Sequence, residues 1–181
     1  FQKFVEDIEE SIKIFKNKLG YNPIYFSYPF GEYNLEQKNY ISNNFEFAFG
    51  QHSGVIDLNK DRYELPRFPI NEKYGEIKRF KEVISYLPLQ YKIIKPENKF
   101  MNDGENPPKM TIEFFEDQKN LENINCFSNE GSKWRKTKIV LIDNILNINF
   151  SEKFLERRGR INCSLKDENG WRFSGFQFVQ N

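Results

Sequence analysis

The sequence predicts an α/β fold class for the first half of the chain and an all-β, sandwich-like unit for the second half. Up to about residue 88, amphipathic helical patterns alternate with short apolar runs, which is typical of α/β layering. From residue 110 onward, short apolar segments are separated by turn signals, as in a small β-sandwich. A polar stretch rich in turn formers lies between these two patterns. We therefore expect domains at 1–90 and 110–181, joined by a linker at 91–109.

The elements of the first half follow from apolar spacing and capping residues. A stripe with helical spacing, ended by Gly20, predicts a helix over residues 4–19. Asn34 is suited to cap a second helix, and a third helical pattern begins at Ile77 and is stopped by Pro88. Buried strands are expected at residues 24–28 and 45–49. An extended segment is expected at residues 65–69, because its two prolines disfavour a helix.

Six strand-like segments are expected in the second half. Turn formers such as Asn129-Glu130-Gly131 separate them. In the last segment the apolar residues change parity across Ser174-Gly175, which predicts a β-bulge. The segments span residues 110–116, 123–127, 138–142, 145–150, 161–165 and 171–179.

The charge balance argues against nucleic acid as a partner. The chain carries 27 basic and 26 acidic residues, for a formal charge of +1, whereas nucleic-acid-binding proteins concentrate basic charge. No apolar run reaches the roughly 18 residues of a membrane-spanning helix, so no transmembrane segment is expected. The chain begins at Phe1 without Met or a signal peptide, and we expect it to be the C-terminal part of a longer protein.

The two cysteines, Cys126 and Cys163, have two open interpretations. Each follows an Ile-Asn pair in a predicted strand, so they are either two buried free thiols or one disulfide. A disulfide indicates a periplasmic or other extracytoplasmic location, and free thiols indicate the cytoplasm. The cysteines do not predict a metal site, because zinc takes about four Cys or His ligands and none lie nearby.

Two segments with unusual backbone residues carry the main functional signal. Residues 27–33, Ser-Tyr-Pro-Phe-Gly-Glu-Tyr, directly follow one predicted strand. Residues 50–54, Gly-Gln-His-Ser-Gly, end the next strand and hold the only histidine of the chain, His52. Loops at strand ends often carry binding and catalytic residues, so both segments are candidates for a functional site.

These segments, together with Leu-Pro-Arg-Phe-Pro at 65–69, resemble the second half of the polysaccharide deacetylase (NodB-like) family. Tyr28-Pro29-Phe30-Gly31 is similar to the Arg-Pro-Pro-aromatic-Gly turn of that family. The resemblance covers about residues 1–88, and the remainder is similar to the β-rich C-terminal extension of some bacterial members. It implies that residues 1–90 form part of a distorted β/α barrel.

The resemblance implies metal-dependent hydrolysis of N- or O-linked acetyl groups on a sugar polymer. The family's Asp-Asp and His-x-x-x-His motifs, which supply the base and hold a divalent metal such as zinc, do not occur in this sequence. We therefore expect an inactive fragment of an enzyme that acts on an acetylated polysaccharide, with no metal ligands in this chain. The alternative is a non-catalytic glycan-binding or assembly module on a degenerate deacetylase scaffold.

Three residues are candidates for catalytic roles under this resemblance. The backbone N–H of Phe30 corresponds to the family's oxyanion donor, and an ordinary turn with a core phenylalanine is the alternative. Ser27 stands where the family has an arginine that orients the base, so Arg67 is a candidate substitute. His52 suits a general acid or a substrate contact, although its position does not match the family's catalytic histidine.

Further residues are candidates for substrate binding. Aromatic side chains of the turn can stack on a sugar ring, although such side chains more often pack in a core. The cluster Arg157, Arg158 and Arg160 is expected at a solvated strand edge, with an anionic glycan or partner as the alternative. The candidates for substrate binding are Tyr28, Pro29, Gly31, Tyr33 and Gln51.

Overall fold

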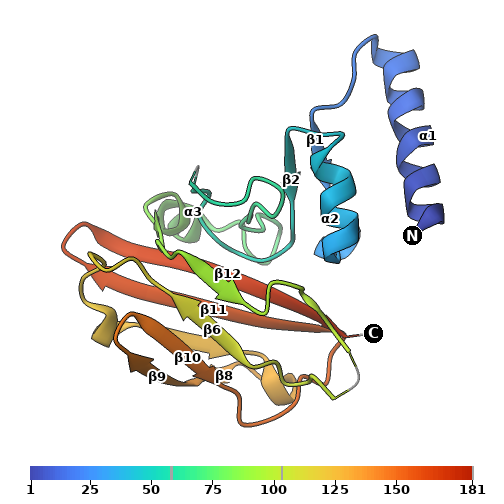
Figure 1. Cartoon of the computed structure of the whole chain (residues 1–181). Coiled ribbons are helices and arrows are strands. Elements are labelled where there is room, and N and C mark those ends of the chain that lie inside the picture. The colour runs from blue at the N-terminus through green and yellow to red at the C-terminus, as the bar shows by residue number, and fades with distance from the viewer. Residues whose placement is uncertain (58, 103, 181) are drawn as a thin grey trace.

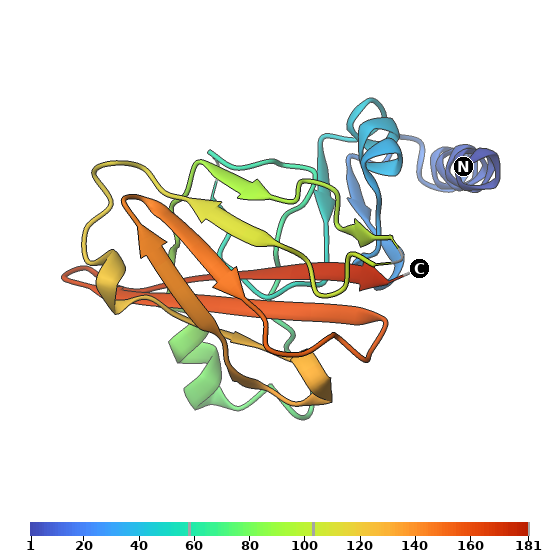
Figure 2. The same ribbon diagram turned by 60° about the horizontal axis from the view of Figure 1, so that its bottom comes forward.

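The computed structural model describes residues 1–57, 59–102 and 104–180. In these residues the chain is mostly β, with three α-helices and three sheets (Figures 1 and 2). The N-terminal elements lie to one side of the two larger sheets in both views. The helices are α1 (Gln2–Leu19), α2 (Leu35–Ser42) and α3 (Ile77–Ile84).

A small N-terminal unit, residues 1–50, is built around a two-stranded parallel sheet. β1 (Tyr25–Ser27) pairs with β2 (Phe47–Phe49), and α2 connects them. Asn34 begins α2 through a capping box, and Gly20, with a φ of 82°, ends α1, so both predicted caps are confirmed. The core of this unit consists of Ile8, Tyr28, Tyr33, Ile41, Phe45 and Ala48.

The other described strands form two sheets that enclose the main core, and we call them the two-sheet unit. One sheet has the order β4-β6-β10-β9, and the other has the order β3-β12-β11-β7-β8 with β5 beside β12. Buried side chains of both sheets, such as Ile112 and Phe178, share one core. The strands are β3 (Leu87–Pro88), β4 (Ile93–Lys95), β5 (Phe100–Met101), β6 (Met110–Glu113), β7 (Asn125–Ser128), β8 (Arg135–Lys136), β9 (Lys138–Ile142), β10 (Ile145–Asn149), β11 (Arg158–Asp167) and β12 (Gly170–Gln180).

The predicted fold class is wrong, because the described residues contain no β/α barrel. The parallel sheet has only β1 and β2, of three residues each, whereas a β/α barrel closes with about eight parallel strands. Residues 50–76 are irregular apart from isolated bridges in the described part, and α3 buries no side chain. The alternating pattern therefore does not continue into barrel layers. The chain is not a partial barrel followed by a sandwich.

The β-bulge predicted at Ser174-Gly175 is also wrong. β11 and β12 pair in one unbroken antiparallel register along their whole length. The apolar parity changes because β12 is covered on both faces, which alternate along a strand. Phe176 and Phe178 belong to the main core, whereas the Phe173 ring stacks on Tyr86 of the preceding segment.

The middle of the chain joins both larger sheets. α3 ends at Ile84 rather than at Pro88, because Leu87 and Pro88 pair with β12 as strand β3. Within the segment 91–109, β4 pairs with β6 and β5 pairs with β12. The division into domains at residues 90 and 109 stays a prediction.

The structure decides between the two interpretations of the cysteines. Cys126 of β7 and Cys163 of β11 lie directly opposite each other in the register and form a disulfide. Both are fully buried in the main core.

No helix of the described residues combines the length and the apolar character that crossing a bilayer requires.

Candidate functional site

The three segments on which the resemblance rests meet at one end of the small parallel sheet. The Tyr28 N–H donates to the Phe49 carbonyl at 3.0 Å, which fixes the turn after β1 beside the end of β2. Phe49 also forms a parallel bridge with Leu65, whose carbonyl accepts from the Gly50 N–H at 2.9 Å. Neighbouring parallel segments end at the same edge, so the loops that follow them lie close together. The candidate site starts from this edge.

The turn after β1 has two consecutive residues in the left-handed conformation, Phe30 with a φ of 57° and Gly31 with a φ of 68°. This conformation is ordinary for glycine but costs a phenylalanine about 1 kcal/mol or more. A side-chain carbon on Gly31 would lie 2.4 Å from the backbone nitrogen of Gln51, so the close contact of the two loops requires glycine. The Phe30 N–H reaches no backbone acceptor in the described part of the chain.

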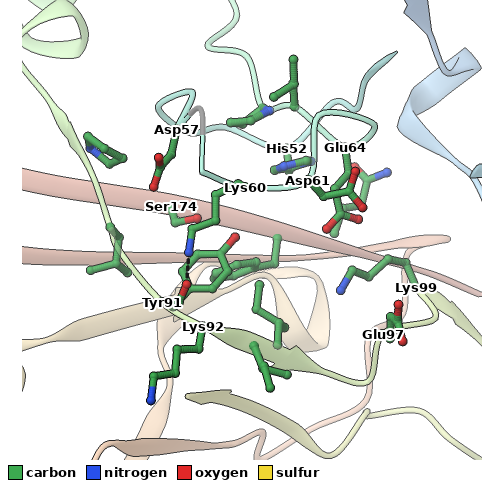
Figure 3. Close-up of a pocket in the computed structure, with 18 of the residues that line it drawn as sticks. His52, Asp57, Lys60, Asp61, Glu64, Tyr91, Lys92, Glu97, Lys99 and Ser174 are labelled. Carbon is green, nitrogen blue, oxygen red and sulfur yellow. Dashed lines mark hydrogen bonds between the residues drawn. The ribbon is translucent and has the colours of Figure 1, made fainter. Parts of the chain in front are cut away.

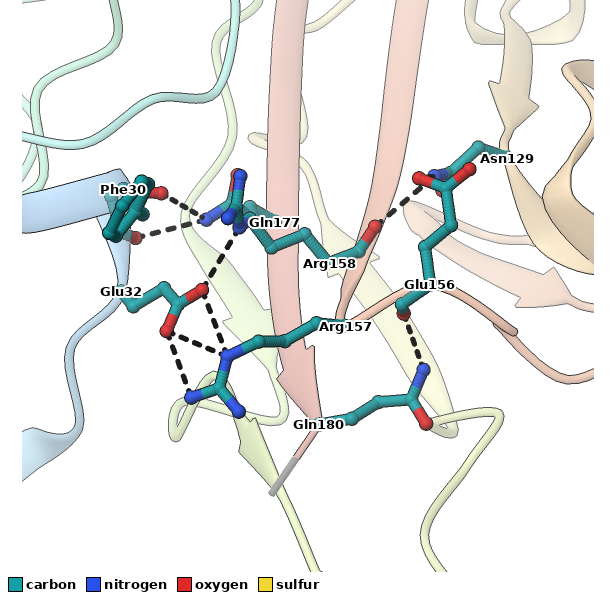
Figure 4. A network of polar contacts seen from close by, with 9 residues as sticks. Phe30, Glu32, Asn129, Glu156, Arg157, Arg158, Gln177 and Gln180 are labelled. Carbon is teal, nitrogen blue, oxygen red and sulfur yellow. Dashed lines mark hydrogen bonds and ion pairs between the residues drawn. The ribbon is translucent and has the colours of Figure 1, made fainter.

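The Gln177 side chain of β12 holds this turn from the two-sheet unit (Figure 4). Its N–H group donates to the carbonyl oxygens of Phe30 and Gly31 at 3.3 and 3.1 Å. Gln177 is 5% exposed, so these hydrogen bonds are shielded from water. Because both acceptors belong to the left-handed residues, the contact stabilises the conformation that the turn has to adopt.

Two arginines at the start of β11 hold the same turn through Glu32 (Figure 4). The Glu32 carboxylate accepts from Arg157 Nε at 3.0 Å and from Arg158 Nε at 2.9 Å. The Arg158 guanidinium also lies 4.9 Å from the centre of the Phe30 ring, within the range of a cation–π contact. Arg157 is solvent-exposed, as expected, whereas Arg158 is half-buried, and both arginines pair with Glu32 of the turn.

Tyr33 belongs to a partly buried polar cluster beside the turn. Its hydroxyl donates to Glu64 at 2.9 Å, and Lys38 Nζ lies 2.7 Å from Asp61 and 3.5 Å from Glu64. Burial raises the pKa of Tyr33 well above its ordinary value, and the charge of Glu64 adds to this effect. Tyr33 is therefore a fixed hydrogen-bond donor, and Lys38 offsets one of the two negative charges of Asp61 and Glu64.

The other predicted site residues occupy different surroundings. Tyr28 is 1% exposed and its ring centre lies 4.3 Å from that of Tyr33, which leaves no open face for a sugar ring. Pro29 and the Phe30 ring are exposed. The Arg67 side chain is exposed as well, and only its backbone N–H reaches the His52 loop, by donating to the His52 carbonyl at 3.1 Å.

His52 is partly buried in the loop after β2. A side-chain carbon on Gly50 would lie 2.7 Å from His52 Nδ1, so glycine makes room for the imidazole ring. Desolvation lowers the pKa of His52 to about 4, against the opposing charge of Glu64 and with a smaller contribution from Lys99. The imidazole is neutral at pH 7 in this state, and it is suited to hydrogen bonding or to accepting a proton rather than to donating one.

A cavity of about 880 Å³ lies between the His52 loop and the two-sheet unit (Figure 3). Small-molecule sites usually have volumes of about 300–1,000 Å³. Among the predicted site residues, His52 and Tyr33 line this cavity, and neither Phe30 nor Arg67 does. The polar side chains that share it without having been predicted include Asp57, Lys60, Asp61, Glu64, Lys99 and Gln177.

These additional residues carry weak signals in the sequence. Gln177 is a polar residue inside the apolar run Phe-Gln-Phe-Val, and such an interruption is the one available hint of a buried polar contact. Glu32 lies inside the motif, but its partners Arg157 and Arg158 are more than a hundred positions away. The cavity lysines follow no pattern that distinguishes them from the surface lysines of the chain.

The donor set for a divalent metal is not formed in the described residues. No group of three or more His, Cys, Asp and Glu side chains there is placed to hold a metal ion. The carboxylates of Asp61 and Glu64, which line the cavity together with His52, both form ion pairs with Lys38. The residues present therefore do not fit the metal that the resemblance implies, and we derive no chemical step through it.

Neither a family model, nor a curated protein, nor a solved structure matches this chain.

Proposed function

We propose that this chain is the C-terminal part of a polysaccharide deacetylase, an enzyme that hydrolyses acetyl groups on a sugar polymer. The Phe30 turn carries the proposal. Its N–H reaches no backbone acceptor among the described residues, and its shape is fixed by the fit of Gly31 against Gln51 and by the Gln177 side chain. A fixed donor of this kind stabilises the oxyanion of a tetrahedral intermediate without having to reorganise.

In this proposal each half of the chain has a defined part. The Phe30 N–H donates to the oxyanion that forms when water attacks the acetyl carbonyl, and one such donor lowers the barrier by about 3 kcal/mol. The neutral His52 contacts the substrate from the neighbouring loop. The two-sheet unit keeps the turn in its left-handed conformation. A divalent metal such as zinc belongs to residues outside this chain.

The test compares two variants of the complete protein that contains this chain. Gly31→Ala forces the turn away from Gln51, and we expect its kcat for acetate release to fall about 100-fold. Phe30→Ala keeps the N–H and removes an exposed ring together with its cation–π contact to Arg158, whereas Gln177 and Glu32 still hold the turn, so we expect its kcat to stay within about threefold of the wild type. Acetate release from an acetylated glycan, with added divalent metals, is the measurement.

Two outcomes would contradict the proposal. One is full activity of Gly31→Ala in a variant whose fold is intact by circular dichroism. The other is the absence of acetate release by the complete protein with any divalent metal. If the complete protein binds the acetylated glycan without releasing acetate, the alternative of a non-catalytic glycan-binding module is favoured.

The disulfide supports a location outside the cytoplasm. Disulfides form and persist in oxidising compartments and are rare in the cytosol. The Cys126–Cys163 bond is fully buried between two strands of the main core, so it forms part of the folded structure. We therefore extend the proposal to a periplasmic or other extracytoplasmic enzyme, where a cell-surface or exported polysaccharide is within reach.

A further inference from the structure

The cavity beside His52 has features that the proposed deacetylation does not use. Most of its lining comes from the segment 52–66, the segment 88–99 and residues 174–177 of β12, and the remaining lining residues are Tyr33, Lys38, Lys109 and Phe115. Figure 3 shows Lys60, Tyr91 and Lys92 at one end, and Lys99 with Glu97 at the other end, near Asp61 and Glu64. A ligand in this space would contact both units of the molecule.

Four of the lysines that line the cavity, Lys60, Lys95, Lys99 and Lys109, form no ion pair in the described residues, unlike Lys38, and burial lowers the pKa of two of them, Lys60 and Lys99. Lys60 and Lys99 form no ion pair within 4 Å in the described residues. Lys60 Nζ donates to the Tyr91 carbonyl and lies 3.4 Å from the centre of the Tyr91 ring. Lys99 Nζ donates to the Pro96 carbonyl at 3.2 Å. An ammonium group has three donors, so each lysine keeps donors for a ligand.

These lysines are costly for the protein to keep charged. Desolvation lowers the pKa of Lys60 to about 8, and the neighbouring Asp57 only partly opposes this shift. Lys99 is 9% exposed, and burial lowers its pKa as well, although Glu64 opposes the shift. A desolvated ammonium group without an anionic partner destabilises the fold, and an anion that enters the cavity would offset that cost.

Gln177 lines the same cavity, and its oxygen is buried beside it. Its Nε2 is used by the Phe30 turn, but its buried Oε1 has no hydrogen-bond partner in the described residues. A buried acceptor of this kind suits a hydroxyl or N–H donor of a ligand. The cavity thus combines ammonium donors and the Gln177 side chain with four carboxylates, those of Asp57, Asp61, Glu64 and Glu97, and its volume of about 880 Å³ is sufficient for one or a few sugar rings.

We propose that this cavity binds an anionic sugar, with its acid group at Lys60 or Lys99 and a hydroxyl at Gln177 Oε1. The acid group is a carboxylate or a phosphate ester, since both accept hydrogen bonds from an ammonium group. This binding needs no metal and does not depend on the proposed deacetylation. All residues that line the cavity belong to this chain, so the chain can be tested for this binding by itself.

The test titrates the chain with three matched sugars and follows the side-chain amide signal of Gln177 by NMR. Glucuronate, glucose 6-phosphate and glucose share one ring and differ only in a carboxylate, a phosphate or a hydroxyl group. We expect at least one anionic sugar to bind about tenfold or more tightly than glucose. The tighter of the two anionic sugars identifies the acid group.

Two lysine variants and one control complete the experiment. Lys60→Met and Lys99→Met keep the apolar stem and remove the charge, and we expect the variant that removes the lysine at the acid group to weaken binding of the anionic sugar about tenfold. Lys99→Met should unfold at the same temperature as the wild type or higher, because it removes a desolvated charge. Lys138→Met, on the exposed side of β9, should bind like the wild type. Equal affinity for glucose and both anionic sugars would overturn the proposal, as would unchanged binding by both cavity variants.

Discussion

His52 shows how its neighbours set the chemistry of a single residue. Gly50 leaves room for the imidazole ring, and burial of the ring at the edge of the cavity desolvates it. The resulting pKa of about 4 is well below the ordinary histidine value of about 6.5. The residue that the sequence offers as a general acid is therefore a neutral group at physiological pH.

The lowered pKa of His52 predicts a specific pH dependence of stability. Between pH 4 and 6.5 the unfolded chain binds a proton at His52 and the folded chain does not, so the free energy of unfolding falls as the pH falls through this window. We expect this loss to be about 2 kcal/mol and to be absent in His52→Gln. Urea unfolding of both proteins at pH 4.5 and 7 measures it. The same pH dependence in both proteins would show that His52 titrates normally.

At the scale of an element, β12 brings the functional parts of the chain together. One face of it closes the main core with Phe176 and Phe178. On the other face Gln177 contacts the N-terminal unit and Phe173 packs against Tyr86 of the middle segment. Its partner β11 is tied in turn to β7 by the Cys126–Cys163 disulfide. The pair β11 and β12 is therefore the rigid platform on which the Phe30 turn rests.

The disulfide predicts how strongly this platform depends on oxidising conditions. The two cysteines are 37 positions apart, and closing a loop of this length in the unfolded chain stabilises the fold by about 4 kcal/mol. Under a reductant, we expect the free energy of unfolding to fall by about that amount in urea titrations. The variant Cys126→Ala/Cys163→Ala serves as the control, since reductant should not change its stability. An identical midpoint for the wild type with and without reductant would contradict the assignment.

At the scale of the whole molecule, the N-terminal unit is held on the two-sheet unit by polar and aromatic contacts. Glu32 of this unit pairs with Arg157 and with Arg158 of β11, and in the segment that joins the two units Phe68 and Tyr86 pack against Phe173 of β12. A side-chain carbon on Gly175 would lie 2.3 Å from the Ser53 carbonyl, so the His52 loop also requires glycine in β12. The turn and the cavity share this junction, because Gln177 donates to the Phe30 turn and also lines the cavity.

The charge cluster at this junction gives the fifth prediction. Glu32→Ala leaves Arg158 without its carboxylate, and we expect the free energy of unfolding to fall by about 1–2 kcal/mol. The amide protons of residues 28–33 should also exchange faster with solvent, because the turn loses one of its two anchors. Glu46→Ala is the matched control, since this side chain is exposed and forms no ion pair in the described residues. Equal exchange in both variants would show that the cluster does not anchor the turn.

Local patterns predicted the local elements of this chain. The caps Gly20 and Asn34 end and begin helices where expected, and most of the predicted strands are present within a few residues. These signals are reliable because a cap or an apolar period depends on residues close in sequence. The predicted barrel and the predicted bulge are wrong. Both depend on which other parts of the chain pack against a strand, and local sequence patterns do not contain this information.

The sequence by itself determined the helices, the strand segments, the two loops with special backbone residues and the absence of a charge bias. Only the tertiary structure decided that Cys126 meets Cys163, that Gln177 and the arginines of β11 hold the Phe30 turn, and that Lys60 and Lys99 share one cavity. The physical reason is the same in each case. Pairing, burial and the resulting pKa values depend on side chains far apart in the chain, whose proximity is set by packing rather than by local propensity.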